Sequence, residues 1–471
     1  MAYIGVATSL IRRGELRVPT GVWNRPDSTS ALSLWPPGYP MLMAGPIWAG
    51  ASPIQSARWV NIVAASVTAA TIVLLVGSAA GTGAGAVAAL VVFATQSVFD
   101  VHLSVLSEPV FLALIVGTLA AMTVARDRLL LLGLLATAAV MVRYAGAAVP
   151  AAVVTWTLLD ERYDYGRRFR RAMVVALVPA VVIAGWLFRT ALAHDRHATP
   201  ELSVYGGWST TVHQAGDTAL NWLAPGLNNS ALQIAIAILA AVAIVVYITA
   251  TVRETAGSRR RQLRQGRVGM LIGAAMMLSF WYVAMLVGSR TFVGGTIPFD
   301  GRILAPLMML VEIATVTGIA YWWRAYHRPM RLAIGLLGAV WLVAAALVTE
   351  NDAVYAVTEG SDFASGSWRN SPLVGWVRAH GNGRILYSNW PPAVYFHAGR
   401  IARQLPDSSD PGDMAGFLKA LRANGGYVVG FDAHSPDVIA PAELARRLSL
   451  HEVARTTDGA VWDAAGNSGQ Q

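Results

Sequence analysis

The stretch DERYDYGRRFRR (Asp160–Arg171) decides the class of fold, because it stands between two long apolar runs. Residues 146–159 before it and residues 172–190 after it contain one charged residue between them, Arg189. Apolar runs of about 20 residues cross membranes as helices, and arginines gather in their cytoplasmic loops. The chain is 55% hydrophobic and only 13% charged, so the same alternation is expected along most of its 471 residues.

Working outward from that loop, we predict an α-helical polytopic membrane bundle of about ten spans. The fourth and fifth apolar runs are short and could instead form one bent hairpin. The predicted spans cover residues 59–78, 83–99, 108–125, 129–142, 146–159, 172–190, 231–252, 268–288, 302–323 and 332–349.

Four arginine-rich loops define the orientation of this bundle. They are residues 126–128, 160–171, 253–267 and 324–331, and all four fall on one face when the spans alternate. The positive-inside rule makes that face cytoplasmic in a cell (plasma) membrane. The net charge is +9, but because the arginines cluster beside spans, nucleic acid is not expected as a partner. The chain has no cysteine, which excludes disulfides and thiolate metal sites.

The chain divides into three predicted parts. Residues 1–58 form an extracytoplasmic first loop, residues 59–349 the transmembrane domain, and residues 350–471 a small extracytoplasmic α/β domain. In the last part, 384–389 and 427–431 are predicted as strands. The segments 413–426 and 441–450 are predicted as helices. No apolar segment precedes the first loop, so we expect a first transmembrane helix to be missing from this sequence.

The first loop ends in the elbow LWPPGYPMLMAG (Leu34–Gly45). Proline fixes φ and lacks a backbone donor, so Pro36 and Pro37 cannot lie inside a helix, whereas Pro40 could begin one. We expect Trp35 and Tyr39 to lie at the membrane interface, as aromatic belts do. An ordinary interfacial turn explains the motif equally well.

Two carboxylates of a short outer loop are the candidate catalytic groups. Glu108 precedes a proline at the start of a span, where an acid is also favoured by the helix dipole alone. Asp100 could be an ordinary loop acid, and that interpretation is slightly favoured. Charged groups at membrane depth are costly, which is why each deserves a functional hypothesis.

Cationic residues at the same outer level are the candidate ligands for an anion. Arg143 and Arg189 lie on the wrong side for positive-inside anchors, so each either reaches lipid headgroups or faces a cavity. Arg302 opens the ninth span, with Asp300 either capping that helix or orienting the guanidinium group. Three outer histidines, His194, His197 and His213, show no helical i, i+4 pair and are expected to be exposed rather than to bind a metal.

These pieces resemble the GT-C superfamily of membrane glycosyltransferases, in the branch of protein O-mannosyltransferases and bacterial aminoarabinose transferases. The resemblance covers nearly the whole chain. It rests on the ordered strings AYIGVATSLIRRGEL, WPPGYPMLMAG, SEPVFLAL, RYAGAAVP, WLFRTAL, FDGRILAPLMML and ILYSNWPPAVYFHAGRIARQLP.

The resemblance implies that a polyprenyl-phosphate sugar donates its sugar, with inversion, to a sugar, lipid or protein acceptor. Glu108 matches a recurrent acid, and Arg143, with its neighbour Tyr144, Arg189 and Arg302 match positions that bind the lipid phosphate. The family's key acid stands before the tyrosine that matches Tyr3, beyond the start of this sequence. A divalent metal stays open as a cofactor, and none is evident from the residues.

Two other function classes remain as alternatives. A transporter or lipid flippase with an outer domain would show inverted repeats around a midplane site. No such repeat is visible, and the polar residues gather at one face, which favours the enzyme. The third hypothesis is a catalytically inactive GT-C-like protein that acts in assembly of the cell envelope.

Overall fold

A computed structural model describes residues 2–22, 29–33, 35–192, 204–227, 231–233, 235, 266–294, 297–323, 326–360, 362–406, 411–433, 435 and 438–463. The chain folds as two compact units. One comprises residues 34–39 and 58–354, and the other comprises residues 1–33, 40–57 and 355–471. The second unit thus combines the two terminal parts that the sequence analysis treated separately.

The first unit is a bundle of apolar helices. Its helices are α3 (Pro53–Ala80), α4 (Thr82–Ala94), α5 (Gln96–Leu103), α6 (Glu108–Val124), α7 (Leu129–Val142), the 3-10 turn η1 (Tyr144–Ala147), α8 (Ala148–Leu158), α9 (Tyr165–Leu192), α10 (Trp208–Leu223), α13 (Arg267–Phe292), α14 (Gly301–Trp322) and α15 (Arg328–Thr358). Most predicted spans correspond to one of these helices. The second, 83–99, instead covers α4 and part of α5, and the seventh, 231–252, lies almost entirely outside the described residues.

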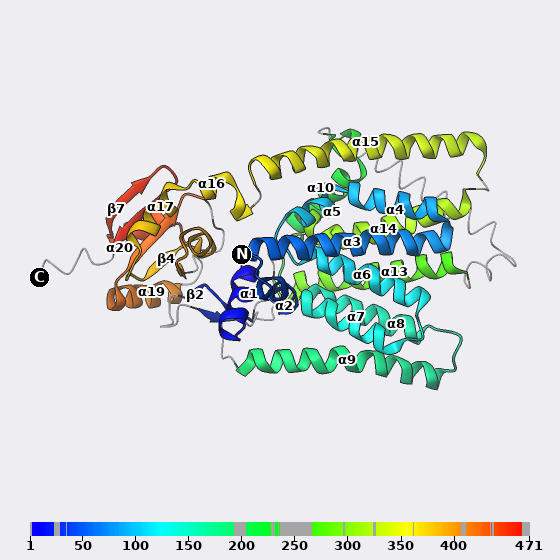
Figure 1. The fold of residues 1–471 in the computed structure, drawn as a ribbon, viewed down its shortest axis with the longest axis horizontal. Coiled ribbons are helices and arrows are strands. Elements are labelled where there is room, and N and C mark those ends of the chain that lie inside the picture. Colours follow the sequence, from blue (N-terminus) through cyan, green and yellow to red (C-terminus); the bar gives the residue numbers. More distant parts are fainter. Residues whose placement is uncertain are drawn as a thin grey trace, which may run out of the picture. The chain divides into compact units, whose positions relative to one another are not determined.

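Five of the helices in the described ranges are long and apolar enough to cross a membrane: α3, α9, α13, α14 and α15. The pair α4 and α5 passes the same test together but is bent by 69°. The helices α6, α7 and α8 are shorter, so the count of about ten spans stays a prediction. Among the long helices α14 is the most buried and α15 the least, and in Figure 1 α9 and α15 lie on opposite sides of the bundle.

The proline elbow leads into a helix, as its composition predicts, and one of its two aromatic side chains is buried. Pro40 lies in the first turn of α2 (Gly38–Trp48), where a missing N–H costs nothing. Tyr39 is fully buried, and its hydroxyl donates to Oδ1 of Asn61 at 3.0 Å. Asn61 in turn donates to the Ser104 carbonyl at 2.7 Å. Tyr39 therefore packs inside the protein, where its hydroxyl finds a buried partner, and its level relative to the membrane interface stays a prediction.

The second unit contains a six-stranded sheet of order β2-β5-β4-β6-β8-β7. The pairings from β2 to β6 are parallel, and those from β6 to β7 are antiparallel. The strands are β2 (Gly21–Val22), β4 (Leu386–Ser388), β5 (Arg403–Gln404), β6 (Tyr427–Phe431), β7 (His451–Thr456) and β8 (Gly459–Asp463). The strand predicted at 427–431 has the observed bounds, and the one predicted at 384–389 contains β4.

Helices cover both faces of this sheet. They include α17 (Pro372–His380), α19 (Pro411–Asn424) and α20 (Pro441–Leu448), beside the short α16 (Gly366–Arg369), α18 (Pro391–Ala393), η3 (Asp362–Ala364) and η4 (Val394–Ala398). The predicted helices at 413–426 and 441–450 correspond to α19 and α20. Neighbouring residues of one strand enter different cores, because strand side chains alternate: Tyr387 packs with Phe417, and Leu386 packs with Val377.

The N-terminal residues contribute a helix and a small ribbon to the second unit. They form α1 (Ala2–Arg13), which ends on two arginines that suit the negative end of a helix. Strands β1 (Arg17–Val18) and β3 (Ser30–Ala31) pair antiparallel beside it. The pairing of β2 with β5 joins residues almost 400 positions apart in the chain, which no local sequence pattern indicates.

Candidate functional site

Glu108 begins α6 and is the most buried acid of the candidate site. Ser107 precedes it and Pro109 follows, so the helix starts where a carboxylate is favoured by the dipole and a missing N–H is tolerated. Its side chain is 3% exposed. The Ser107 hydroxyl lies 3.4 Å from Oε2. A carboxylate this deeply buried needs a cation, because an unpaired buried charge costs several kcal/mol.

Two arginines from different helices supply that cation. Arg143 forms an ion pair with Oε1 of Glu108 through Nη1, and Nε of Arg302 lies 3.6 Å from the same oxygen. Arg143 adopts an extended conformation that ends α7, and Arg302 lies in the first turn of α14. The Arg143 side chain is 17% exposed and that of Arg302 is 45% exposed. Arg302 is thus the more exposed of the two guanidinium groups.

The start of α14 is fixed by two further contacts. Asp300 accepts a hydrogen bond from the Ile303 amide at 2.9 Å, as an N-cap does. The Tyr282 hydroxyl of α13 donates to the Ile303 carbonyl at 2.7 Å. Asp300 therefore caps the helix that carries Arg302, which is the simpler of its two predicted roles.

Tyr144 and Arg189 form a neighbouring group rather than part of the Glu108 group. The Trp186 indole donates to the Tyr144 hydroxyl at 3.0 Å, and the Arg189 guanidinium carbon lies 4.8 Å from the Trp186 ring centre. Tyr144 follows Arg143 directly, so the two groups adjoin through one residue. This places a second cation beside the first group.

Asp100 lies on α5, with other partners. It is near enough to Asp352 of α15 for electrostatic repulsion, and Gln96 donates to Asp352 at 2.8 Å. Within the described ranges no contact connects Asp100 with Glu108, and no three His, Cys, Asp or Glu residues are grouped as metal ligands would be. His213 is exposed on α10, whereas His194 and His197 lie outside the described residues.

Two buried charged residues escaped the sequence analysis. Glu312 lies in the middle of α14 and is 5% exposed; its Oε1 accepts from Trp222 Nε1 at 2.6 Å and from the Thr95 hydroxyl at 2.5 Å. Arg290, at the end of α13, is 3% exposed. The signal for both was present, because each is a charged residue at an apolar helix where burial demands a reason. Glu312 ties α14 to α10 and to the bend between α4 and α5.

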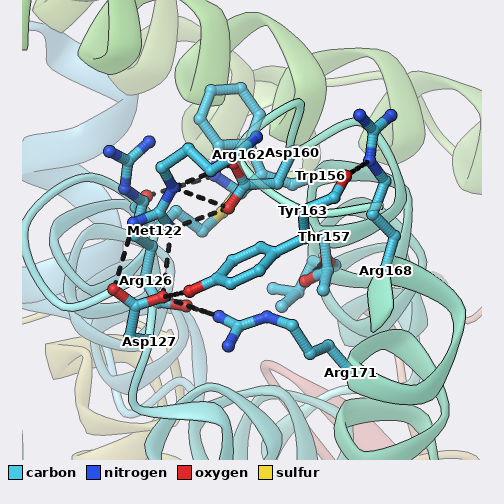
Figure 2. Close-up of polar contacts among 11 residues, drawn as sticks. Met122, Arg126, Asp127, Trp156, Thr157, Asp160, Arg162, Tyr163, Arg168 and Arg171 are labelled. Carbon is cyan, nitrogen blue, oxygen red and sulfur yellow. Dashed lines mark hydrogen bonds and ion pairs between the residues drawn. The ribbon is translucent and has the colours of Figure 1, made fainter. Parts of the chain in front are cut away.

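A second carboxylate–arginine group lies beyond the other end of α6. We call it the Asp127 cluster, and it comprises Asp127, Asp160, Arg162, Tyr163 and Arg171 (Figure 2). Asp127 accepts from Arg162 at 3.0 and 3.1 Å, from the Tyr163 hydroxyl at 2.9 Å and from Arg171 at 2.8 Å. These contacts, led by the hydrogen bond from Arg162, lower the pKa of Asp127 to about 2.

The Asp127 cluster joins the loop between α6 and α7 to the loop between α8 and α9. Both are among the four basic loops that define the predicted cytoplasmic face. The Asp127 side chain is 55% exposed, in contrast to the 3% of Glu108. We therefore assign this cluster a structural role in connecting two helical hairpins.

Comparison with known proteins shows the fold of this chain. No protein-family model matches the sequence, and no curated protein matches it. Among solved structures, ArnT from Cupriavidus metallidurans bound to undecaprenyl phosphate aligns with a TM-score of 0.62 at 12% identity. The same protein in the apo state aligns with a TM-score of 0.57 at 13% identity. Both alignments cover 100% of this chain and 94% of the other.

This likeness shows that the chain has the fold of ArnT. Together with the apolar helices, it shows a multi-pass membrane protein with an ArnT-like fold. At this level of identity the likeness concerns the fold alone.

Proposed function

We propose that this chain is a membrane glycosyltransferase that moves a sugar from a polyprenyl-phosphate donor to an extracytoplasmic acceptor, with inversion. The observation that carries the proposal is the pair of guanidinium groups, Arg143 and Arg302, which meet on Glu108 at one end of a bundle with the fold of ArnT. One of the two is half exposed, as a residue that meets a lipid headgroup must be. The donor, membrane lipid and the acceptor are the proposed partners.

The reaction needs one bond to form and one to break. The acceptor hydroxyl oxygen attacks the anomeric carbon of the sugar, its proton passes to a carboxylate, and the bond from the anomeric carbon to the phosphate oxygen breaks. The lipid phosphate leaves with the electron pair and a negative charge. A cation placed at the leaving oxygen lowers the barrier, because it stabilises charge that develops in the transition state. Arg302 is the described residue best placed for this role.

The contacts of Glu108 suggest that it positions the arginines. Its Oε1 is occupied by Arg143 and lies next to Arg302, so this oxygen has little freedom to accept a proton from an acceptor hydroxyl. Ionised carboxylates in bidentate or shared pairs orient guanidinium groups strongly. The prediction that Glu108 or Asp100 is the general base stays a prediction, and so does the binding of the donor by Tyr144 and Arg189.

A transfer assay tests the proposal. The purified full chain, reconstituted in lipid vesicles, is incubated with a polyprenyl-phosphate sugar bearing a labelled sugar and with a panel of sugar, lipid and peptide acceptors. We expect release of polyprenyl phosphate with label on an acceptor, and a loss of roughly 100-fold or more in Arg302→Ala, comparable to the removal of one transition-state donor.

Arg128→Ala is the matched control, since Arg128 is an exposed arginine in the loop at the other end of the bundle. It should transfer sugar at the wild-type rate. Equal rates in Arg302→Ala and Arg128→Ala would contradict the site. Binding of the donor without any release of polyprenyl phosphate would contradict the enzyme and favour a transporter or an inactive relative.

A further inference from the structure

Arg290 is held in place by three hydrogen bonds to neutral groups. Its Nε donates to the Thr211 hydroxyl at 2.9 Å. Its Nη2 donates to the carbonyls of Gly206 and Gly207 at 3.0 and 3.1 Å. The guanidinium carbon also lies 5.4 Å from the centre of the Trp208 ring. These contacts fix the guanidinium group at the start of α10, because Gly206 and Gly207 immediately precede that helix.

No negative charge balances this arginine within the described part of the chain. The residue is 3% exposed, and its Nη1 is buried without a hydrogen-bond partner among the described residues. A buried guanidinium group normally meets a carboxylate or fills all its donors, because a buried unpaired charge is costly. Arg143 shows that this chain follows the rule elsewhere, by pairing with Glu108.

The start of α10 adds a second positive feature at the same place. The helix is 16 residues long and follows Gly207, whose φ of 75° suits glycine, and no side chain caps it. The first amide groups of a helix lack intrahelical acceptors and carry a partial positive charge. A guanidinium group beside them is repelled by that charge. An anion would satisfy both the arginine and the amide groups.

We propose that Arg290 and the first turn of α10 form a binding site for a phosphoryl oxyanion. A tetrahedral phosphate offers acceptors in several directions, so it can take hydrogen bonds from Nη1 and from backbone amides together. The segment that joins α13 to α14 spans only 293–300, so this site lies at the same end of the bundle as Arg302. The phosphate belongs either to a lipid headgroup or to a water-soluble molecule.

The test measures binding alone. Thermal unfolding of the detergent-solubilised full chain is followed in one arm with inorganic phosphate against chloride of equal ionic strength. In the other arm polyprenyl phosphate is compared with the polyprenol that lacks the phosphate. A ligand that binds only the folded chain raises its melting temperature. We expect stabilisation in at least one arm, and the responding arm identifies the source of the phosphate.

Arg290→Gln should weaken the responding ligand at least about tenfold, as the loss of a hydrogen bond to a charged group does. Arg128→Gln, an exposed arginine at the other end of the bundle, is the control and should bind as wild type. If Arg290→Gln does not fold, Arg290→Lys keeps the charge, lacks the fork of donors and should still bind more weakly. No stabilisation in either arm, or equal stabilisation in wild type and the Arg290 variants, overturns the proposal. The readout is independent of sugar transfer, so either proposal can fail alone.

Discussion

The two ends of α6 carry the same chemistry in opposite surroundings. At the first residue, Glu108 meets two arginines from α7 and α14; three residues beyond the last turn, Asp127 meets Arg162 and Arg171. The helix has 17 residues, so the two groups are separated by about 25 Å, close to the apolar thickness of a bilayer. Glu108 is buried and Asp127 is exposed, so the same pairing of groups has a different energetic role at each end of the helix.

The difference follows from the burial of the carboxylate rather than from the ion pairs themselves. Around Glu108 the packed starts of α6 and α14 exclude water, so each partner depends on the other for its solvation. Asp127 itself is 55% exposed, so water solvates its carboxylate and its ion pairs contribute little to stability. Removing one partner should therefore lower the free energy of unfolding strongly in a buried pair and only slightly in an exposed pair.

Matched neutral substitutions at the two carboxylates give the largest contrast. Glu108→Gln leaves Arg143 buried without a counter-charge and should lower the free energy of unfolding by about 3–5 kcal/mol. Asp127→Asn should lower it by no more than about 1 kcal/mol. Unfolding by SDS titration in mixed micelles measures both. Equal losses would show that burial does not distinguish the two groups.

Removing both partners of the buried pair should cost less than removing one. In Glu108→Gln/Arg143→Met no unpaired charge remains from this pair, because Arg302 is half exposed and can turn to water. We expect about 1–3 kcal/mol of the loss in Glu108→Gln to be recovered, as a double-mutant cycle measures. Sugar transfer should not recover, since the arginine is gone. A double variant as unstable as the sum of the singles would contradict the pairing.

The comparison also shows what could be read from the sequence. Apolar length and arginine loops located the helices, because a bilayer imposes both. Three site residues could be selected from the sequence because each is a charged residue beside an apolar run: Glu108, Arg143 and Arg302. No local pattern indicated that both arginines approach the same oxygen of Glu108. Nor did any indicate that Arg189 contacts Trp186 instead. Glu108 and Arg302 are more than 190 residues apart in the sequence, and only the packing of the helices brings them together.

Three other features were not predicted from the sequence. The helix α10 falls between two predicted spans, where no helix was predicted, since its sequence WSTTVHQAGDTALNWL is too polar to span a membrane; its side chains contact α13 and α14. Glu312 was passed over inside a predicted span, although its cost of burial is itself the signal. The parallel pairing of β2 with the C-terminal sheet depends on topology alone.

Glu312 provides a further comparison with Glu108, because it is also buried but contacts no arginine among the described residues. Glu312→Leu would leave the partly buried Trp222 indole without its acceptor, while the Thr95 hydroxyl keeps the Val91 carbonyl at 3.2 Å, and it should cost about 1–3 kcal/mol. Glu312→Gln retains an oxygen for both donors and should cost less than about 1 kcal/mol. The same SDS titration measures the two variants. Losses of equal size would mean that these hydrogen bonds do not hold α10 and the α4–α5 bend to α14.

The smallest effect is expected from titration of the exposed cluster. The pKa of Asp127 is lowered from 3.8 to about 2 because Arg162 and its neighbours favour the ionised form in the folded chain. Its contribution to stability is therefore complete above pH 3.8 and is lost as the pH falls through about 2. The difference in melting temperature between wild type and Asp127→Asn should shrink over that interval.

The same difference in melting temperature should also shrink in high salt, which screens exposed charges at a Debye length of about 3 Å in 1 M salt. The corresponding difference for Glu108→Gln should persist in the same salt, because a buried pair is screened far less. A salt response of equal size at both ends of α6 would show that the Glu108 group is open to water, and that the contrast between the two ends is wrong.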